Sequence, residues 1–168
     1  DNQEIKKLSE YISNLNVIIF CPEAIELIKG SPSVRRTFLN IEIAQLNKKY
    51  LKILSVYNNL LRTRNEYLKQ INENKIIDEI YFDIITNKLI DNAIYIYQNR
   101  NEFIEKINSE IDKIYFQLAN SDKMRIKYLS NINNYSSEAI KQRLSEKYKS
   151  GFKSEVEQGK TLFGPHRD

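Results

Sequence analysis

From Ser33 to Ser150 the chain contains neither glycine nor proline. These residues interrupt helices most strongly, at a cost of about 1 kcal/mol for glycine and about 3 kcal/mol for proline in a helix interior. A stretch of this length without either residue favours long helices over a fold rich in turns. We therefore predict a mainly α fold, an antiparallel hairpin or bundle of long helices with a few short strands near its ends.

Apolar residues recur along this stretch at steps of three and four, the spacing of one helical face. A first series, interrupted by Arg36 and Arg64, ends at the expected turn NENK at 72–75, and a second series follows it. We expect the two series to face each other, each on an arm of ~40 residues spanning ~60 Å. The first comprises Arg36, Leu39, Ile43, Leu46, Tyr50, Ile53, Tyr57, Leu60, Arg64, Tyr67 and Ile71, and the second Phe82, Ile85, Leu89, Ala93, Ile96, Arg100, Phe103, Ile107, Ile111, Ile114 and Leu118.

The segment before these helices contains two of the three prolines. The apolar, β-branched run at 16–20 predicts a buried strand. Pro22 stands where a helix begins easily and Gly30 where one ends, so a short helix is expected over 23–29. Together these features predict a rigid corner leading into the first long helix.

The segment after the long helices is expected to return toward the same end. The alternating pattern at 124–130 predicts a strand, 136–159 predicts a helix broken near Gly151, and 160–164 predicts a further strand. The chain is thereby divided into three parts. These are 1–31, a strand and corner; 32–121, the helical arm; and 122–168, a strand, a helix and a return strand.

Composition excludes several classes of protein. The longest apolar run, Val17 to Cys21, is far shorter than the ~20 residues of a membrane span, and Cys21 is the only cysteine. A cytoplasmic setting without a disulfide or metal site is the simplest interpretation. The formal charge of +4 permits nucleic-acid binding without requiring it. Because the chain begins with Asp1 and stops within a motif, we expect a segment of a larger protein.

Basic residues around the start of the first long helix are candidate contacts for phosphate groups. Guanidinium groups bind phosphate in a fixed, two-pronged geometry. The alternative is an ordinary solvated basic face, with the aliphatic stem of Arg36 laid over the apolar series. The candidates are Lys29, Arg35, Arg36, Lys48, Lys49 and Lys52.

Two short stretches match parts of catalytic motifs, but the rest of each motif is missing. Gly159–Thr161 spells GKT, as at the end of a phosphate-binding loop, but Ser154 stands where that loop needs a glycine and no strand precedes it. His166 precedes Arg167 and Asp168 as in a kinase catalytic loop, but the accompanying kinase motifs are missing. A structural role for His166 is as reasonable as a chemical one.

Two motifs, in order and suitably separated, resemble those of the RecF family of bacterial DNA replication and repair proteins. They are NLNVIIFCPEAIELIKGSPSVRRTFLN at 14–40 and TLFGPHRD at 161–168. Ala24 and Asn40 stand where the family has aspartate, Cys21 where it has serine or threonine, and Val34 where an acid is frequent, so a family role needing an acid at Ala24 or Asn40 is not carried over. The matching residues, which the resemblance implies couple an ATPase head to its arm, are Pro22, Glu23, Gly30, Ser31, Pro32, Gly164, Pro165, His166, Arg167 and Asp168.

The resemblance implies that this chain is an internal segment, the helical lid or arm domain of an ABC-type ATPase with a sliver of its head at each end. The short predicted strands would belong to that head. The family's Walker A motif would lie before this segment, and its signature and Walker B motifs after it. The resemblance therefore implies no catalytic residue, metal ligand or cofactor in this chain, with ATP and Mg²⁺ bound by the parent protein.

For the parent protein, the resemblance implies a cytoplasmic role in DNA repair, replication and recombination and in the SOS response to DNA damage. It implies an ATP-dependent homodimer that binds duplex DNA at gap junctions and, with RecR and RecO, helps to load RecA. Two alternatives remain open. One is a purely structural helical scaffold without direct DNA contact, and the other, disfavoured by the missing phosphate loop, is an independent enzyme.

Overall fold

The computed structural model describes residues 25–119, 124–130, 132 and 135–168. The predicted strand at 16–20, together with Pro22 and Glu23, lies outside the described residues. The mainly α fold class is confirmed. The helices are α2 (Glu26–Lys29), α3 (Pro32–Leu46), α4 (Lys48–Asn72), α5 (Glu79–Ala119) and α6 (Ser137–Gln158).

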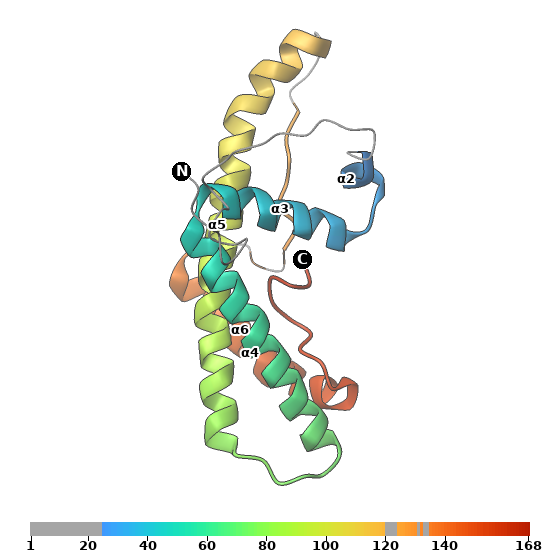
Figure 1. Cartoon of the computed structure of the whole chain (residues 1–168), viewed down its shortest axis with the longest axis vertical. Helices are drawn as coiled ribbons and strands as arrows, with labels where there is room; N and C mark the ends of the chain where they lie inside the picture. Colours follow the sequence, from blue (N-terminus) through green and yellow to red (C-terminus); the bar gives the residue numbers. More distant parts are fainter. Residues whose placement is uncertain (1–24, 120–123, 131, 133–134) are drawn as a thin grey trace, which may run out of the picture.

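The antiparallel hairpin of α4 and α5 forms the long axis of the molecule (Figure 1). The chain reverses at the predicted turn, where Asn74 adopts φ 55°. Many members of each apolar series are buried between the helices, but the burial is not continuous, since Leu46 and Ile114 are 68% and 55% exposed. The buried members of the two series, apart from their arginines, are Ile43, Tyr50, Tyr57, Phe82, Ile85, Leu89, Ala93 and Ile96.

The prediction of one continuous helix along the first series is wrong at Asn47. This residue takes φ −142° and ψ 95° between α3 and α4. Its Oδ1 accepts hydrogen bonds from two backbone N–H groups in the first turn of α4, at 3.0 and 3.2 Å. Its Nδ2 donates to Tyr95 Oη and Asn99 Oδ1 of α5, both at 3.0 Å. Because this side chain caps α4 and binds α5, α3 lies at an angle across the hairpin (Figure 1).

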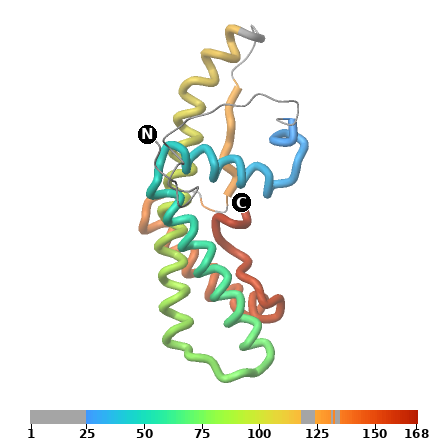
Figure 2. The backbone as a smooth tube through the Cα atoms, in the orientation of Figure 1, coloured from blue at the N-terminus to red at the C-terminus, as the bar shows by residue number. Residues whose placement is uncertain are grey.

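Helix α6 packs against both arms of the hairpin, and the segment after it runs back beside α4 (Figure 2). The predicted break near Gly151 is wrong, because α6 is continuous there. A Cβ atom at Gly151 would lie 2.5 Å from Cε2 of Phe163, so this glycine provides space for the ring. The helix ends instead at Gly159, whose φ of 58° is the left-handed conformation that glycine tolerates best.

No strand forms among the described residues, so the predicted strands at 124–130 and 160–164 are wrong. Side chains provide hydrogen bonds that a neighbouring strand would otherwise supply. The Ile126 backbone exchanges two hydrogen bonds with the Asn108 side chain, at 2.8 and 2.9 Å. The N–H of Leu162 donates to Glu155 Oε1 at 2.8 Å. The three-part division at 31/32 and 121/122 stays a prediction.

Candidate coupling site around the C-terminal motif

The segment Thr161–Asp168, here called the C-terminal motif, lies between the hairpin and α6 and carries half of the predicted coupling residues. Thr161, Gly164 and Pro165 are buried although no helix or strand contains them. Buried backbone outside regular structure needs hydrogen-bond partners from elsewhere. In this protein the partners come mainly from buried side chains on the helices.

Arg64 on α4 is the first of these side chains and is 1% exposed. Its guanidinium donates to Glu155 Oε2 at 2.7 Å, to Thr161 Oγ1 at 2.8 Å and to Thr86 Oγ1 at 3.1 Å. It also lies 4.4 Å from the ring centre of Tyr148, a cation–π contact. One arginine therefore joins α4, α5, α6 and the C-terminal motif.

Arg100 on α5 forms the second junction and is 2% exposed. Its guanidinium donates to the carbonyl of Pro165 at 2.6 Å, to Asn40 Oδ1 at 3.1 Å and to Tyr128 Oη at 3.2 Å. Its Nη1 lies 3.8 Å from the Asp168 carboxylate. Arg100 therefore links α3, α5, the 124–130 segment and the C-terminal motif.

His166 is held as a neutral side chain. Its Nε2 lies 3.1 Å from the carbonyl oxygen of Thr161, which can only accept, so Nε2 carries the proton and donates it. Its Nδ1 then accepts from Tyr57 Oη at 2.7 Å. Burial, assisted by the positive charge of Arg167, lowers the pKa of His166 to about 4. The residue is a structural link between α4 and the motif.

Asp168 is enclosed by hydroxyl groups and arginines. Its carboxylate accepts from Tyr128 Oη at 2.5 Å and from Tyr97 Oη at 3.5 Å. The Arg36 guanidinium donates to its backbone carbonyl. Burial raises the pKa of the Asp168 carboxyl, although these hydrogen bonds and the charge of Arg100 oppose the shift. Arg36 thereby connects α3 to the motif.

Two features require glycine at position 164, its backbone conformation and the close packing around it. Its φ of 131° is a conformation that residues with a side chain rarely adopt. A Cβ atom there would lie 2.6 Å from Tyr57 Oη and 3.1 Å from Nδ1 of His166. The glycine therefore allows the chain to pass against the Tyr57–His166 pair.

The predicted coupling residues at the other end, Gly30, Ser31 and Pro32, form the joint between α2 and α3. The N–H of Gly30 closes α2, and Pro32 opens α3, where its missing N–H is not needed. Arg35 donates to two backbone carbonyls at the end of α2, both at 3.0 Å. Arg36, one residue further on, binds the C-terminal motif, so this joint and the motif meet through α3.

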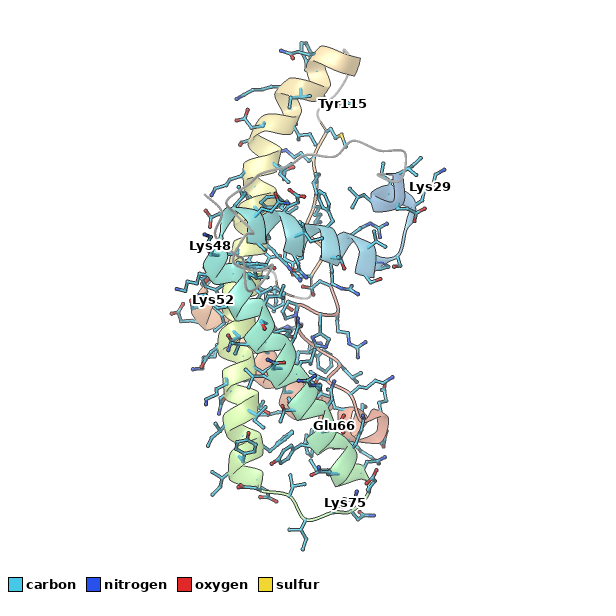
Figure 3. The ribbon with its side chains drawn as sticks, in the orientation of Figure 1. Lys29, Lys48, Lys52, Glu66, Lys75 and Tyr115 are labelled. Atoms are coloured by element: carbon cyan, nitrogen blue, oxygen red, sulfur yellow. The ribbon has the colours of Figure 1, made fainter. Side chains whose placement is uncertain are left out.

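The candidate phosphate contacts lie in two separate groups. Lys29 is at the α2–α3 joint, on the other side of the view from Lys48 and Lys52 in the first turns of α4 (Figure 3). Lys49 lies 5.0 Å from the ring centre of Tyr95. The structure does not bring the two groups together, and the three lysines of α4 form one exposed basic patch.

The GKT sequence does not form a phosphate-binding loop. Such a loop leads into the first turn of a helix, whose N–H groups face the phosphates. Here Gly159 ends α6, and the Thr161 hydroxyl is already bound by Asn65 and Arg64. These residues therefore do not fit the phosphates of a nucleotide.

Two other kinds of site do not occur in the part of the chain that the structure describes. No cluster of three or more histidine, cysteine or carboxylate side chains has the arrangement of a metal site. No helix there is both long and apolar enough to cross a bilayer.

Sequence reasoning identified the motif but missed most of its partners. Arg64 was evident only as an interruption of the first series, and Arg100 was counted as a member of the second. An arginine at a core position needs a buried acceptor, and this signal could have identified both residues. Glu155 and Tyr128 gave no such signal, because neither residue interrupts an apolar series and their partners Arg64 and Arg100 lie far away in the sequence.

No protein-family model matches the chain. It is 41% identical over 168 residues to the DNA replication and repair protein RecF of Listeria monocytogenes serotype 4b (strain CLIP80459), covering 98% of this chain and 45% of that protein. It is 38% identical over 169 residues to RecF of Ligilactobacillus salivarius (strain UCC118), with the same coverage. The chain thus spans less than half the length of the curated relatives it matches.

Solved structures of RecF agree with the sequence comparison. The recombination mediator protein RecF-ATP in the RecFOR pathway superposes with a TM-score of 0.89 at 30% identity, covering 97% of this chain and 44% of that chain. The RecF-ATPrS form gives a TM-score of 0.88 at the same identity and coverage. The resemblance to RecF that the two motifs indicated is confirmed.

Proposed function

We propose that this chain, which matches RecF proteins along nearly its whole length, is the helical arm domain of a longer RecF recombination mediator. In this role the C-terminal motif and the α2–α3 joint connect the arm to an ATP-binding head. The arm carries the state of the head to the surface that meets DNA. The relatives' description as DNA replication and repair proteins supports this assignment.

The observation that carries the proposal is the attachment of the C-terminal motif to three helices through arginine side chains. Arg36, Arg64 and Arg100 bind it from α3, α4 and α5 respectively. Two of these cations are almost fully buried. Charged hydrogen bonds in the core are costly to break, so a displacement of the motif would move the helices with it.

The activities of the parent protein follow from the same proposal. The parent binds ATP with Mg²⁺, dimerises in the ATP-bound state and binds duplex DNA at gap junctions in the cytoplasm. With RecR and RecO it assists the loading of RecA, including during the SOS response. Solved RecF structures described with ATP and with the RecFOR pathway support the nucleotide and the two partner proteins.

The chain alone is proposed not to hydrolyse ATP. Phosphoryl transfer needs a phosphate cradle, a lysine and a metal-binding carboxylate in one place. The geometry at Gly159–Thr161 provides no such cradle. ATP turnover by the purified chain that is absent from a mock preparation would contradict this part of the proposal.

Coupling is tested with two neighbouring arginines of α3 in the full-length protein. Arg36→Met removes the contact with the motif, whereas Arg35→Met removes an equal charge whose hydrogen bonds, among the described residues, go to α2. We expect Arg36→Met to reduce the ratio of DNA affinities measured with and without ATP, and Arg35→Met to leave that ratio unchanged. Equal ratios in both variants would contradict the coupling role.

Direct DNA contact by the arm is tested separately, by fluorescence anisotropy of duplex DNA during a salt titration. Replacing Lys48, Lys49 and Lys52 by alanine should weaken binding and reduce the slope of log K against log salt by about one for each lost phosphate contact. Replacing Lys88, Lys106 and Lys113, which are also exposed, is the control for net charge. Identical slopes in the two triple variants would favour the alternative, a structural scaffold that does not touch DNA.

A further inference from the structure

The tip of the hairpin, where α4 turns into α5, exposes apolar side chains that contribute little to the monomer core. Ile76 is 102% exposed and Ile80 is 75% exposed. Ile84, one helical turn after Ile80, is 44% exposed, and Tyr81 is 46% exposed. Residues 76, 80 and 84 form a stripe over the turn and the first turns of α5, here called the tip stripe. A contiguous exposed apolar surface of this kind marks an interaction site.

A groove opens beside the tip stripe, between the end of α4, the start of α5 and α6, and Ile76 of the stripe lies at its edge. Its volume is about 940 Å³. Ile71, Phe82, Ile90 and Tyr148 supply apolar lining, and Phe152 on α6 is 40% exposed beside them. The groove is therefore an apolar recess at the same end of the molecule as the apolar projection.

Opposite charges line the groove. Asp83 lies on the α5 wall and Lys149 on the α6 wall. Neither side chain takes part in an ion pair within the described part of the chain. Glu79 adds a negative charge on the α5 side, and Lys75, at the tip in Figure 3, lies at the turn. The surface thus carries acid on one side and base on the other, a self-complementary arrangement.

We propose that the tip is a docking site for a second copy of this chain, related to the first by a two-fold axis. The tip stripe of each copy enters the groove of the other, and Asp83 of each copy faces Lys149 of its partner. A two-fold interface requires that one surface carry both halves of the contact. Here the projection and the recess are neighbours and the charges are of both signs, so two such contacts close a dimer.

The association is weak because the tip is small. Stable interfaces bury about 800 Å² on each partner, and smaller ones belong to transient complexes. A few exposed isoleucines and two pairs of surface charges correspond to a dissociation constant on the order of 0.1 mM. Dimerisation of the chain is therefore measured from micromolar to millimolar concentration, by sedimentation velocity.

An exchange of charges tests the two-fold geometry. Lys149→Glu alone and Asp83→Lys alone each place two like-charged pairs in the homodimer, and each should weaken self-association about tenfold. An equimolar mixture of the two variants pairs opposite charges at both contacts. It should recover the affinity of the unaltered chain, whereas either single variant associating as tightly as the unaltered chain would overturn the proposal.

The apolar contact is tested by Ile80→Asp, with Leu129→Asp as the matched control. Leu129 is 72% exposed in the 124–130 segment, away from the tip. Both variants should retain the helical circular dichroism of the parent chain, and only Ile80→Asp should remain monomeric throughout the concentration series. A chain that is monomeric at millimolar concentration before any substitution would overturn the proposal.

Discussion

Arg64 is a cation inside the core, and its cost is offset by the groups around it. Glu155 neutralises its charge, and Thr86, Thr161 and the Tyr148 ring occupy its remaining directions. Glu155 is itself 0% exposed and also accepts the N–H of Leu162. Each member of this group is therefore stable only because the others are present.

Removing one partner of the Arg64–Glu155 pair should be much more damaging than removing both. We expect Arg64→Met to lower the free energy of unfolding by roughly 3–5 kcal/mol, because it leaves the Glu155 carboxylate buried and unpaired. Combining it with Glu155→Gln should recover about 2 kcal/mol of that loss. Urea unfolding of Arg64→Met, of Glu155→Gln and of the double variant measures this coupling. Lys106→Met, in an exposed pair with Glu102, should change stability by less than about 1 kcal/mol.

His166 should make stability depend on pH between its ordinary pKa of 6.5 and its folded pKa of about 4. Because the folded state disfavours the imidazolium, the unfolded state takes up the proton first, and stability falls as pH drops through this window. The loss should reach roughly 3 kcal/mol, at about 1.4 kcal/mol for each pH unit. Burial raises the pKa of Asp168, so the folded state takes up this proton first, and the effect increases stability as the pH falls at the acidic end of the range.

The test compares the chain with its His166→Gln variant by urea unfolding at pH 7, 6, 5 and 4. His166 is the only histidine, so the difference between the two curves isolates its titration. We expect the stability of the unaltered chain to decrease more steeply than that of the variant as the pH is lowered. Parallel curves would show that His166 titrates alike in the folded and unfolded states.

At the scale of elements, the sequence predicts which segments are helical better than where they bend. The two apolar series placed the hairpin correctly because a helical period depends only on nearby residues. Asn47 ends α3 through its contacts with Tyr95 and Asn99 on another helix, which no pattern along the first series contains. The extended segment at 124–130 has a strand-like pattern, but one of its residues is bound by Asn108 rather than by a strand.

Gly151 illustrates the same limit, and its role can be tested. Alanine is a better helix former than glycine by about 1 kcal/mol, so Gly151→Ala would stabilise α6 if propensity decided the outcome. We expect a loss of about 1–3 kcal/mol instead, because the new Cβ atom would displace the Phe163 ring. In a Phe163→Ala background the same substitution should stabilise the chain. Thermal unfolding of the four combinations distinguishes these outcomes, and a stabilising effect in both backgrounds would contradict the packing role.

At the scale of the whole molecule, the C-terminal motif completes the core that the helices leave open. Arg100 donates to Pro165, Arg64 to Thr161, and Tyr57 to His166. The sequence identified the motif through its resemblance to a family, but it did not predict that the motif packs beside α4. The eight residues from 161 to 168 are therefore part of the same packed unit as the helices.

Ending the chain at Lys160 should destabilise helices that remain complete in sequence. The truncation removes hydrogen-bond acceptors from both buried arginines, and each buried donor left unsatisfied costs about 1–3 kcal/mol. Their sum is a large part of the roughly 5–15 kcal/mol that stabilises a typical domain. We expect amide hydrogen exchange to accelerate along α4 and α5, most strongly around Arg64 and Arg100.

A synthetic peptide of residues 161–168 should restore the slow exchange when it is added to the truncated chain. The recovery should saturate with peptide concentration, because the peptide occupies a defined site between the helices. A peptide of the same composition in scrambled order, which keeps the charges but not the order of Thr161, Pro165 and Asp168, should have no effect. Equal exchange in the truncated and complete chains would show that the helices are stable alone, and that the C-terminal motif contributes nothing to their stability.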